Sequence, residues 1–201
     1  MNDASGKAHL RRLAAARRDR LTAVERQRKA AALAEAAPTI HRLARGGVVS
    51  CFSSFGNELD TAPLIAALDR LGCRLALPVV GRKGHPLTFR PWRPGDEMKP
   101  GPFGILQPLP ERGRVEPSLF LAPLLLFDRE GYRLGYGGGF YDRTLQEARS
   151  RRKILAIGLA FAEQEFPRVP RESYDQRLDG VLTDEGIVRC QGGGIAHSLP
   201  W

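Results

Sequence analysis

The first forty residues alternate between apolar and charged positions at helical spacing. Residues 6–20 and 22–37 are rich in Ala, Leu and Arg, which favours two helices. Thr22 followed by Glu25 matches a capping box, in which each side chain satisfies a free backbone donor of the other residue. Pro38 is expected to end the second helix. The chain therefore opens with a helical extension over residues 1–37.

The pattern then changes to short apolar runs separated by one amphipathic stretch. Residues 46–52 and 73–80 predict two strands, and residues 64–72 between them predict a helix that ends at a glycine. Thr61 stands where a helix N-cap is expected. A strand, a helix and a second strand in this order are typical of a parallel α/β sheet.

The rest of the chain continues the α/β pattern after a long excursion. Residues 81–117 are rich in proline and glycine, with one short strand expected near 87–92. Residues 118–127 are apolar at nearly every position, which predicts a central strand buried on both faces. The remaining predicted elements are a helix at 140–150, a buried strand at 153–161 and a terminal strand pair at 179–189.

These elements predict one α/β domain over residues 1–189, with a mobile tail at 190–201. Composition agrees with a globular fold, since 42% of the 201 residues are hydrophobic and 26% are charged. No apolar run approaches the roughly 18 residues needed to cross a bilayer, and no secretory signal is recognisable. Three scattered cysteines predict neither disulfides nor a zinc site. We therefore expect a cytoplasmic protein.

Positive charge is concentrated at the start of the chain. Residues 1–30 hold nine bases and three acids, which gives +6 of the total net charge of +9. Such a cluster indicates a polyanionic partner such as a nucleotide triphosphate, a nucleic acid or an acidic lipid, or else a solvated helix face.

The most unusual stretch is RLGYGGGFYDR at residues 133–143. It lies between a predicted buried strand and a predicted helix, where ligands bind in open α/β sheets. Glycines allow a ligand to approach the backbone, and N–H groups at a helix start can converge on an anion. The stretch is neither a Walker A loop nor a G-x-G-x-x-G loop. Its chemistry favours a phosphate cradle.

The residues around this loop carry a family resemblance. The segment FDREGYRLGYGGGFYDR (127–143) resembles the signature F-D-x-x-G-x-R-L-G-x-G-x-G-[YF]-Y-D of the 5-formyltetrahydrofolate cyclo-ligase family. The resemblance extends over nearly the whole chain, through NELDT (57–61), FGILQP (103–108), LAFAEQ (159–164) and YDQRLDGVLTDEG (174–186). It implies a three-layer α/β/α fold with a largely parallel sheet, similar to the NagB/RpiA/CoA-transferase-like architecture, with an N-terminal helical extension.

The resemblance also implies an activity. Members of this family convert 5-formyltetrahydrofolate to 5,10-methenyltetrahydrofolate and release ADP and phosphate from ATP. Transfer of the γ-phosphoryl group to the formyl oxygen would make it a leaving group for attack by N10. The protein would act by positioning and charge stabilisation, so no covalent catalytic residue is assigned.

The site implied by the resemblance has three parts. Its ATP-binding residues are Lys7, Arg11, Arg133, Leu134, Gly135, Tyr136, Gly137, Gly138, Gly139, Phe140 and Tyr141. Its folate-binding residues are Ser53, Glu58, Tyr136 and Phe140, with Glu58 either recognising the pterin or assisting proton loss from N10. Its Mg²⁺ ligands are Asp142 and Asp179, whereas Asp128 either orients the loop, which we favour, or assists the metal.

Some members of the family carry a base at each of two loop positions, and this chain has Tyr136 and Gly138 there instead. The cationic role is therefore expected to fall on Lys7, Arg11 and Mg²⁺. Alternatives remain for the basic segment, which could be a nucleic-acid-binding helix or an organelle transit peptide. We expect a monomer that acts on small molecules.

Overall fold

The computed structural model describes residues 3–191, so the predicted tail at 190–201 lies outside them apart from its first two residues. Its centre is a seven-stranded sheet with the order β11-β10-β9-β6-β1-β2-β3. The five inner strands pair in parallel, and β3 and β11 pair antiparallel at the edges. The strands are β1 Val48–Ser50, β2 Arg74–Val79, β3 Thr88–Pro91, β6 Leu119–Pro123, β9 Leu155–Leu159, β10 Gly180–Thr183 and β11 Gly186–Arg189.

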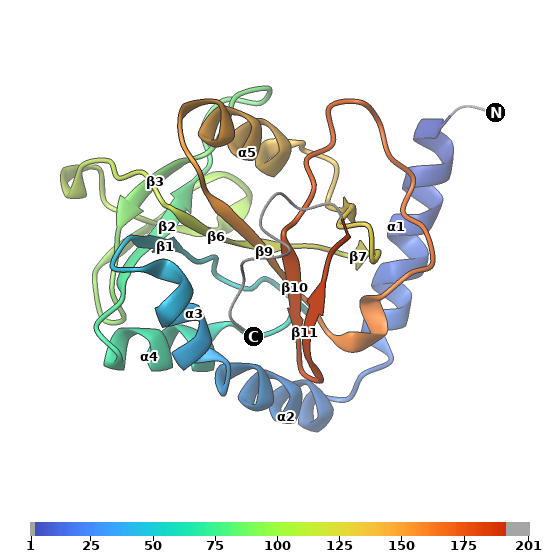
Figure 1. The fold of residues 1–201 in the computed structure, drawn as a ribbon, viewed down its shortest axis with the longest axis horizontal. Helices are drawn as coiled ribbons and strands as arrows, with labels where there is room; N and C mark the ends of the chain where they lie inside the picture. Colours follow the sequence, from blue (N-terminus) through green and yellow to red (C-terminus); the bar gives the residue numbers. More distant parts are fainter. Residues whose placement is uncertain (1–2, 192–201) are drawn as a thin grey trace.

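Helices cover both faces of this sheet, as the α/β prediction requires (Figure 1). On one side lie α2 Ala23–Ala34, α3 Ala37–Ala44 and α4 Ala62–Arg70, and on the other lies α5 Phe140–Arg151. Side chains alternate along β6, with Leu119 and Leu121 in one core cluster and Phe120 and Ala122 in the other. The central strand is therefore buried on both faces, as its continuous apolar run predicts.

The N-terminal extension contains one more helix than the sequence predicts. The first helix, α1, spans Asp3–Asp19, and the second, α2, begins at the predicted capping box of Thr22 and Glu25. The expectation that Pro38 ends the second helix is wrong. Pro38 lies in the first turn of α3, where its missing N–H removes no helical hydrogen bond.

The predicted single apolar strand at 118–127 is divided in two, which positions the glycine-rich stretch. After β6 ends at Pro123, β7 (Leu126–Phe127) pairs antiparallel with β8 (Arg133–Leu134). Asp128 stabilises the turn between them, because its carboxylate accepts hydrogen bonds from the backbone N–H groups of Glu130, Tyr132 and Val169. Asp128 thus orders the turn that precedes the glycine-rich stretch, and its role in orienting that stretch stays a prediction.

The excursion at 81–117 contains the expected short strand and a hairpin that the sequence did not indicate. The expected strand is β3, at the edge of the main sheet. The hairpin pairs β4 (Met98–Pro100) with β5 (Leu106–Pro108), and short 3-10 turns at Pro102–Gly104 and Pro110–Arg112 accompany it. The last turn of this kind is Ala162–Gln164, after β9.

Two composition-based expectations can be compared with the described residues. No helix within residues 3–191 combines the length and apolarity that a membrane span needs. Cys51, Cys73 and Cys190 are free thiols in this structure.

Candidate active site

The glycine-rich stretch forms an open turn, here called the glycine loop (Gly135–Gly139), between β8 and α5. Gly137 and Gly139 have φ values of 96° and 63°, which only glycine adopts readily. A Cβ atom on Gly138 would lie 2.7 Å from the Phe140 ring, so a side chain there would displace the ring. The loop therefore presents bare backbone at the start of a twelve-residue helix, as the sequence predicts.

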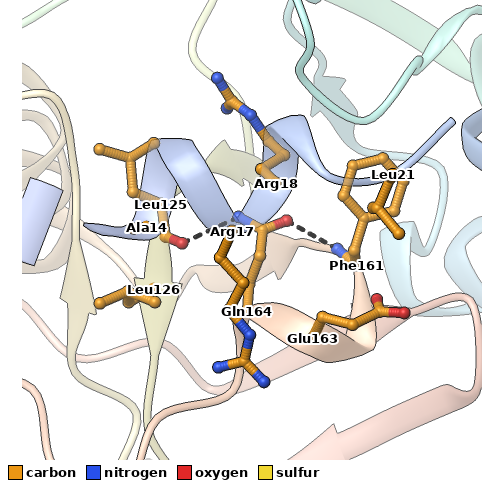
Figure 2. Close-up of a pocket in the computed structure, with 9 residues that line it drawn as sticks. All are labelled: Ala14, Arg17, Arg18, Leu21, Leu125, Leu126, Phe161, Glu163 and Gln164. Carbon is orange, nitrogen blue, oxygen red and sulfur yellow. Dashed lines mark hydrogen bonds between the residues drawn. The ribbon is translucent and has the colours of Figure 1, made fainter. Parts of the chain in front are cut away.

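Helix α1 packs beside this loop through a closely fitted contact. Figure 2 shows the crevice where Ala14, Arg17, Arg18 and Leu21 of this segment meet Leu125, Leu126 and residues of the Ala162–Gln164 turn. The volume of this crevice that a water molecule could occupy is about 0 Å³, so the two surfaces pack closely. Ala14 is only 4% exposed. The N-terminal extension is thus part of the site's framework.

Two arginines of α1 contact the glycine loop directly. Arg11 donates from Nε to the Gly135 carbonyl oxygen at 2.9 Å, and its guanidinium carbon lies 3.3 Å from where a Cβ of Gly137 would be. Arg18 donates to the Tyr136 hydroxyl at 2.8 Å. The spacing of positions 7, 11 and 18 predicts that they share one face of the helix. Arg11 and Arg18 on this face contact the loop.

Lys7 shares this helix face, but two carboxylates surround its ammonium group. Lys7 is 8% exposed, and its Nζ lies 3.0 Å from Asp175 Oδ2 and 3.3 Å from Glu172 Oε1. Burial is the largest single influence and lowers the pKa of Lys7. The hydrogen bonds and charges of Asp175 and Glu172 together outweigh it, so the pKa is raised above its ordinary value. Lys7 is therefore a charged residue that already has anionic partners.

Arg133 is buried at the base of the loop instead of facing it. Its guanidinium donates to Asp142 Oδ1 at 2.7 Å and to the Gln176 carbonyl oxygen. Burial lowers the pKa of Arg133, while the charge of Asp142 opposes the shift. Because Asp142 balances its charge, Arg133 ties β8 to α5 and to the segment around Gln176.

The two predicted metal ligands lie in different surroundings. Asp142 stands in the first turn of α5, and its Oδ1 accepts hydrogen bonds from Arg133 and from the Gln176 N–H at 3.0 Å. Asp179 precedes β10 and is 4% exposed. Its Oδ2 accepts a hydrogen bond from the Ala156 N–H at 2.8 Å and lies 3.4 Å from Arg149. Burial raises the pKa of Asp179.

This donor set fits a metal at Asp142 better than at Asp179. No hydrogen bond from a described residue reaches Asp142 Oδ2, and the side chain is 22% exposed. Asp179 instead joins β9 to β10 and contacts α5 at Arg149, two helical turns from Asp142. Within residues 3–191 no cluster of three or more His, Cys, Asp or Glu side chains could hold a metal ion. Any Mg²⁺ here would depend on oxygens from a bound phosphate.

Two of the predicted folate-side residues, Glu58 and Tyr136, lie near each other. Glu58 lies within hydrogen-bonding reach of the Tyr136 hydroxyl, and burial and the charge of Glu58 raise the pKa of Tyr136. The Tyr141 hydroxyl is buried with no hydrogen-bond partner among the described residues. Burial, and then Glu58, raise the pKa of Tyr141 as well. A buried hydroxyl without a partner suits a polar ligand group.

The other predicted residues of the site are less directly engaged. Ser53 lies half-buried in the turn after β1. Leu134 is 2% exposed and packs in the small core cluster that anchors α1. The ring of Phe140 lies 5.7 Å from the Arg143 guanidinium. Asn57, next to Glu58, donates to Asp19 at the end of α1, at 3.0 Å.

Sequence analysis missed several side chains that contact these residues. Glu172 and Asp175 are the partners of Lys7, and Arg143 donates to the Gly138 carbonyl oxygen. Asp175 falls inside the motif at 174–186, so that motif was the available signal. Nothing in the local sequence pairs Glu172 with a lysine 165 positions earlier.

A separate cavity of about 370 Å³ lies along the face of α5 that carries Thr144, Ala148 and Arg151. Phe89 and Phe120 also line it. None of the residues predicted from the sequence for the site lines this cavity. It is therefore distinct from the glycine loop.

The fold is a mainly parallel α/β sheet, and its glycine loop lies between β8 and the start of α5, next to Arg11 and Arg18 of α1. The model of the 5-formyltetrahydrofolate cyclo-ligase family matches residues 3–184. The chain belongs to this family, and it is an enzyme of the cyclo-ligase class.

Individual relatives agree with this assignment. The 5-formyltetrahydrofolate cyclo-ligase of Escherichia coli K12 is 36% identical over 180 residues, which cover 85% of this chain and 96% of the relative. That of Haemophilus influenzae is 32% identical over 174 residues, covering 82% and 90%. The NMR structure of Aquifex aeolicus 5,10-methenyltetrahydrofolate synthetase superposes with a TM-score of 0.77 at 29% identity, covering 93% of this chain and 94% of that one.

Proposed function

We propose that this enzyme converts 5-formyltetrahydrofolate and ATP to 5,10-methenyltetrahydrofolate, ADP and phosphate at the glycine loop. The observation that supports this most strongly is the bare backbone of Gly135–Gly139, with bases of α1 in contact with it and with Glu58 and the Tyr141 hydroxyl nearby. A triphosphate needs the first surface, and a pterin with several polar groups suits the second.

The nucleotide would lie between α1 and the start of α5. Lys7, Arg11 and the segment Arg133–Tyr141 form this part of the proposed site. Arg11 contributes a guanidinium, and the loop contributes backbone N–H groups at the positive end of α5. This arrangement makes residues 1–37 part of the catalytic unit.

The folate would lie on the side of Ser53, Glu58, Tyr136 and Phe140. Glu58 either accepts hydrogen bonds from the amino-pyrimidine edge or favours proton loss from N10. The Tyr136 hydroxyl accepts a hydrogen bond from Arg18 and lies near Glu58, so Tyr136 would lie at the border of the two substrates.

The proposed reaction has two steps whose atoms balance. The formyl oxygen attacks the γ-phosphorus, the bond to the β-phosphate oxygen breaks, and ADP leaves. N10 then attacks the formyl carbon, loses its proton, and expels phosphate with the original formyl oxygen. The chain's own contribution is to align the two substrates and to balance negative charge with fixed donors.

Mg²⁺, when bound to the phosphates, supplies further stabilisation of the transferring phosphoryl group. Asp142 and Asp179 are its proposed protein ligands. Oδ2 of Asp142 is the carboxylate oxygen available for this purpose, whereas Asp179 would first have to exchange its contacts with Ala156 and Arg149.

Isotope transfer tests this mechanism directly. The purified enzyme is mixed with Mg-ATP and 5-formyltetrahydrofolate labelled with ¹⁸O in the formyl group, and the near-ultraviolet absorbance of the methenyl product is followed. We expect product only when ATP is present, with one ¹⁸O atom in each phosphate released. Product formation without ATP, or label released in water, would refute the phosphorylated intermediate.

A further inference from the structure

The glycine loop contains no basic side chain between Leu134 and Asp142, so its cations must come from elsewhere. Five nearby bases differ in what they contact. Lys7 pairs with two carboxylates, and Arg133 pairs with one. Only neutral groups contact Arg11, Arg18 and Arg143 among the described residues. These three arginines supply the uncompensated positive charge around the loop.

Arg143 is the one that α5 contributes, and it folds back over the loop. Its Nη2 donates to the Gly138 carbonyl oxygen, and its Nη1 lies 2.8 Å from where a Cβ of Gly139 would be. Its guanidinium lies over the Phe140 ring. Nε of Arg143 is buried and has no hydrogen-bond partner within residues 3–191. A buried guanidinium donor without a partner is costly unless a ligand completes it.

Arg11 and Arg143 therefore approach the same loop from two helices. Arg11 lies against Gly135 and Gly137, and Arg143 lies against Gly138 and Gly139. Arg11 takes up space that a side chain on Gly137 would fill, and Arg143 does the same at Gly139, which gives these two glycines a second purpose beyond their backbone angles. Two planar guanidinium groups next to a bare backbone are well suited to phosphate oxygens.

We propose that Arg143 binds the β- and γ-phosphates of the nucleotide, opposite Arg11, and supplies the charge that the loop itself lacks. This inference rests on the proposed function, because it assigns a further residue to the same nucleotide site. The role requires the charge and the planar fork together. If Arg143 only held the Gly138 carbonyl oxygen, neither its charge nor its planar fork would affect nucleotide binding.

Binding measurements with ATP, ADP and AMP test the assignment in Arg143→Gln and Arg143→Lys. Arg151→Gln is the matched control, because Arg151 lies on the same helix, is exposed, and pairs with Glu147 and Glu116. We expect Arg143→Gln to weaken ATP binding about 10- to 100-fold and AMP binding less than about 2-fold. Arg143→Lys should fall between wild type and Arg143→Gln, and Arg151→Gln should bind like wild type.

The same variants are followed by thermal unfolding and by steady-state kinetics. Unchanged ATP affinity in a folded Arg143→Gln protein would overturn the proposal, as would an equal loss of ATP and AMP binding, which would indicate a merely structural role. A raised KM for ATP with an unchanged KM for 5-formyltetrahydrofolate would support it. Failure of the wild-type protein to bind ATP would refute the proposed function instead, so the two failures are distinguishable.

Discussion

At the scale of single residues, the ammonium group of Lys7 already pairs with two carboxylates, although its site is expected to receive the negatively charged phosphates of ATP. Glu172 and Asp175 contact it at 3.3 and 3.0 Å, and Asp175 also accepts a hydrogen bond from the Glu172 N–H. If Lys7 binds ATP, phosphate oxygens share the ammonium with these carboxylates. The arrangement keeps Lys7 ordered and charged before the nucleotide arrives.

We expect Lys7→Ala to reduce both stability and ATP use, for separate reasons. Loss of the ammonium leaves two carboxylates near each other, which should cost about 1–3 kcal/mol of unfolding free energy. Loss of a charge-assisted contact should raise the KM for ATP about 10-fold or more. Denaturant unfolding and steady-state kinetics measure the two effects.

Adding Glu172→Gln to Lys7→Ala separates the effect on stability from the effect on the KM for ATP. The double variant should regain stability, since one of the two opposed carboxylates is gone, while its KM for ATP stays high. Recovery of both properties would show that Lys7 is structural only. An unchanged KM in the single variant would remove Lys7 from the nucleotide site.

Local sequence predicts some of these residues and not others. The glycine run and the helical stripe of Lys7 and Arg11 can be predicted, because both are patterns formed by residues close together in the sequence. The carboxylates that hold Lys7 lie 165 and 168 positions away, and only folding brings them together. Arg143 resembles an ordinary exposed base of α5 until its side chain is seen to turn back over Phe140.

At the scale of elements, the position of α1 decides whether the site exists. The helix is anchored by few apolar side chains, chiefly Leu10 and Ala14, against Leu125, Leu126 and Leu134. Its contact with the Ala162–Gln164 turn is closely packed but small (Figure 2). A modest change at this contact should therefore affect function before it affects the sheet.

Ala14→Asp tests this dependence, with Ala16→Asp as its control. Ala14 is 4% exposed, whereas Ala16 lies on the solvent side of the same helix, so both variants add one acid to one element. We expect Ala14→Asp to detach α1, to expose its arginines to trypsin, and to reduce kcat/KM for ATP at least about 10-fold, because a buried unpaired charge is strongly unfavourable. Equal behaviour of the two variants would contradict the anchoring role.

Hydrophobic pattern predicted most elements, and its failures have physical causes. The main strands are predictable because their apolar runs are bounded by glycine, proline or polar residues, and α5 is predictable because a helical pattern follows the glycines. Helix α3 was missed because Pro38 was taken as an end signal, although proline is equally suited to a first turn. The β7–β8 pair was missed because the apolar run continues past Pro123 while the chain turns. Residues 118–127 are apolar on both sides of Pro123, so the composition of this run does not mark the place where the chain turns.

At the scale of the whole molecule, one buried lysine joins the helical extension to the far end of the sheet. Lys29 of α2 is 8% exposed, and its Nζ lies 2.5 Å from Asp184 Oδ2 and 2.8 Å from Glu163 Oε1. Asp184 also accepts a hydrogen bond from the Ala162 N–H at 2.9 Å. Burial is the largest single influence and lowers the pKa of Lys29, but the two carboxylates outweigh it and raise the pKa.

This network predicts how stability changes in alkali. Because the folded state raises the pKa of Lys29, its contribution is complete below the unfolded pKa of about 10.4 and is lost as pH rises through the folded value. Lys29→Met should lower the unfolding free energy by about 3 kcal/mol at pH 8, since it leaves two acids without their cation. It should also flatten the alkaline decline relative to wild type.

Denaturant unfolding from pH 8 to pH 11 measures both effects, with Lys99→Met as the control, because Lys99 is exposed and has no side-chain partner within residues 3–191. Lys99→Met should follow the wild-type curve, displaced little at any pH. An alkaline decline of the same steepness in Lys29→Met and wild type would show that other groups govern it. In that case the charge of Lys29 would contribute no measurable part of the link between α2 and the β10–β11 turn.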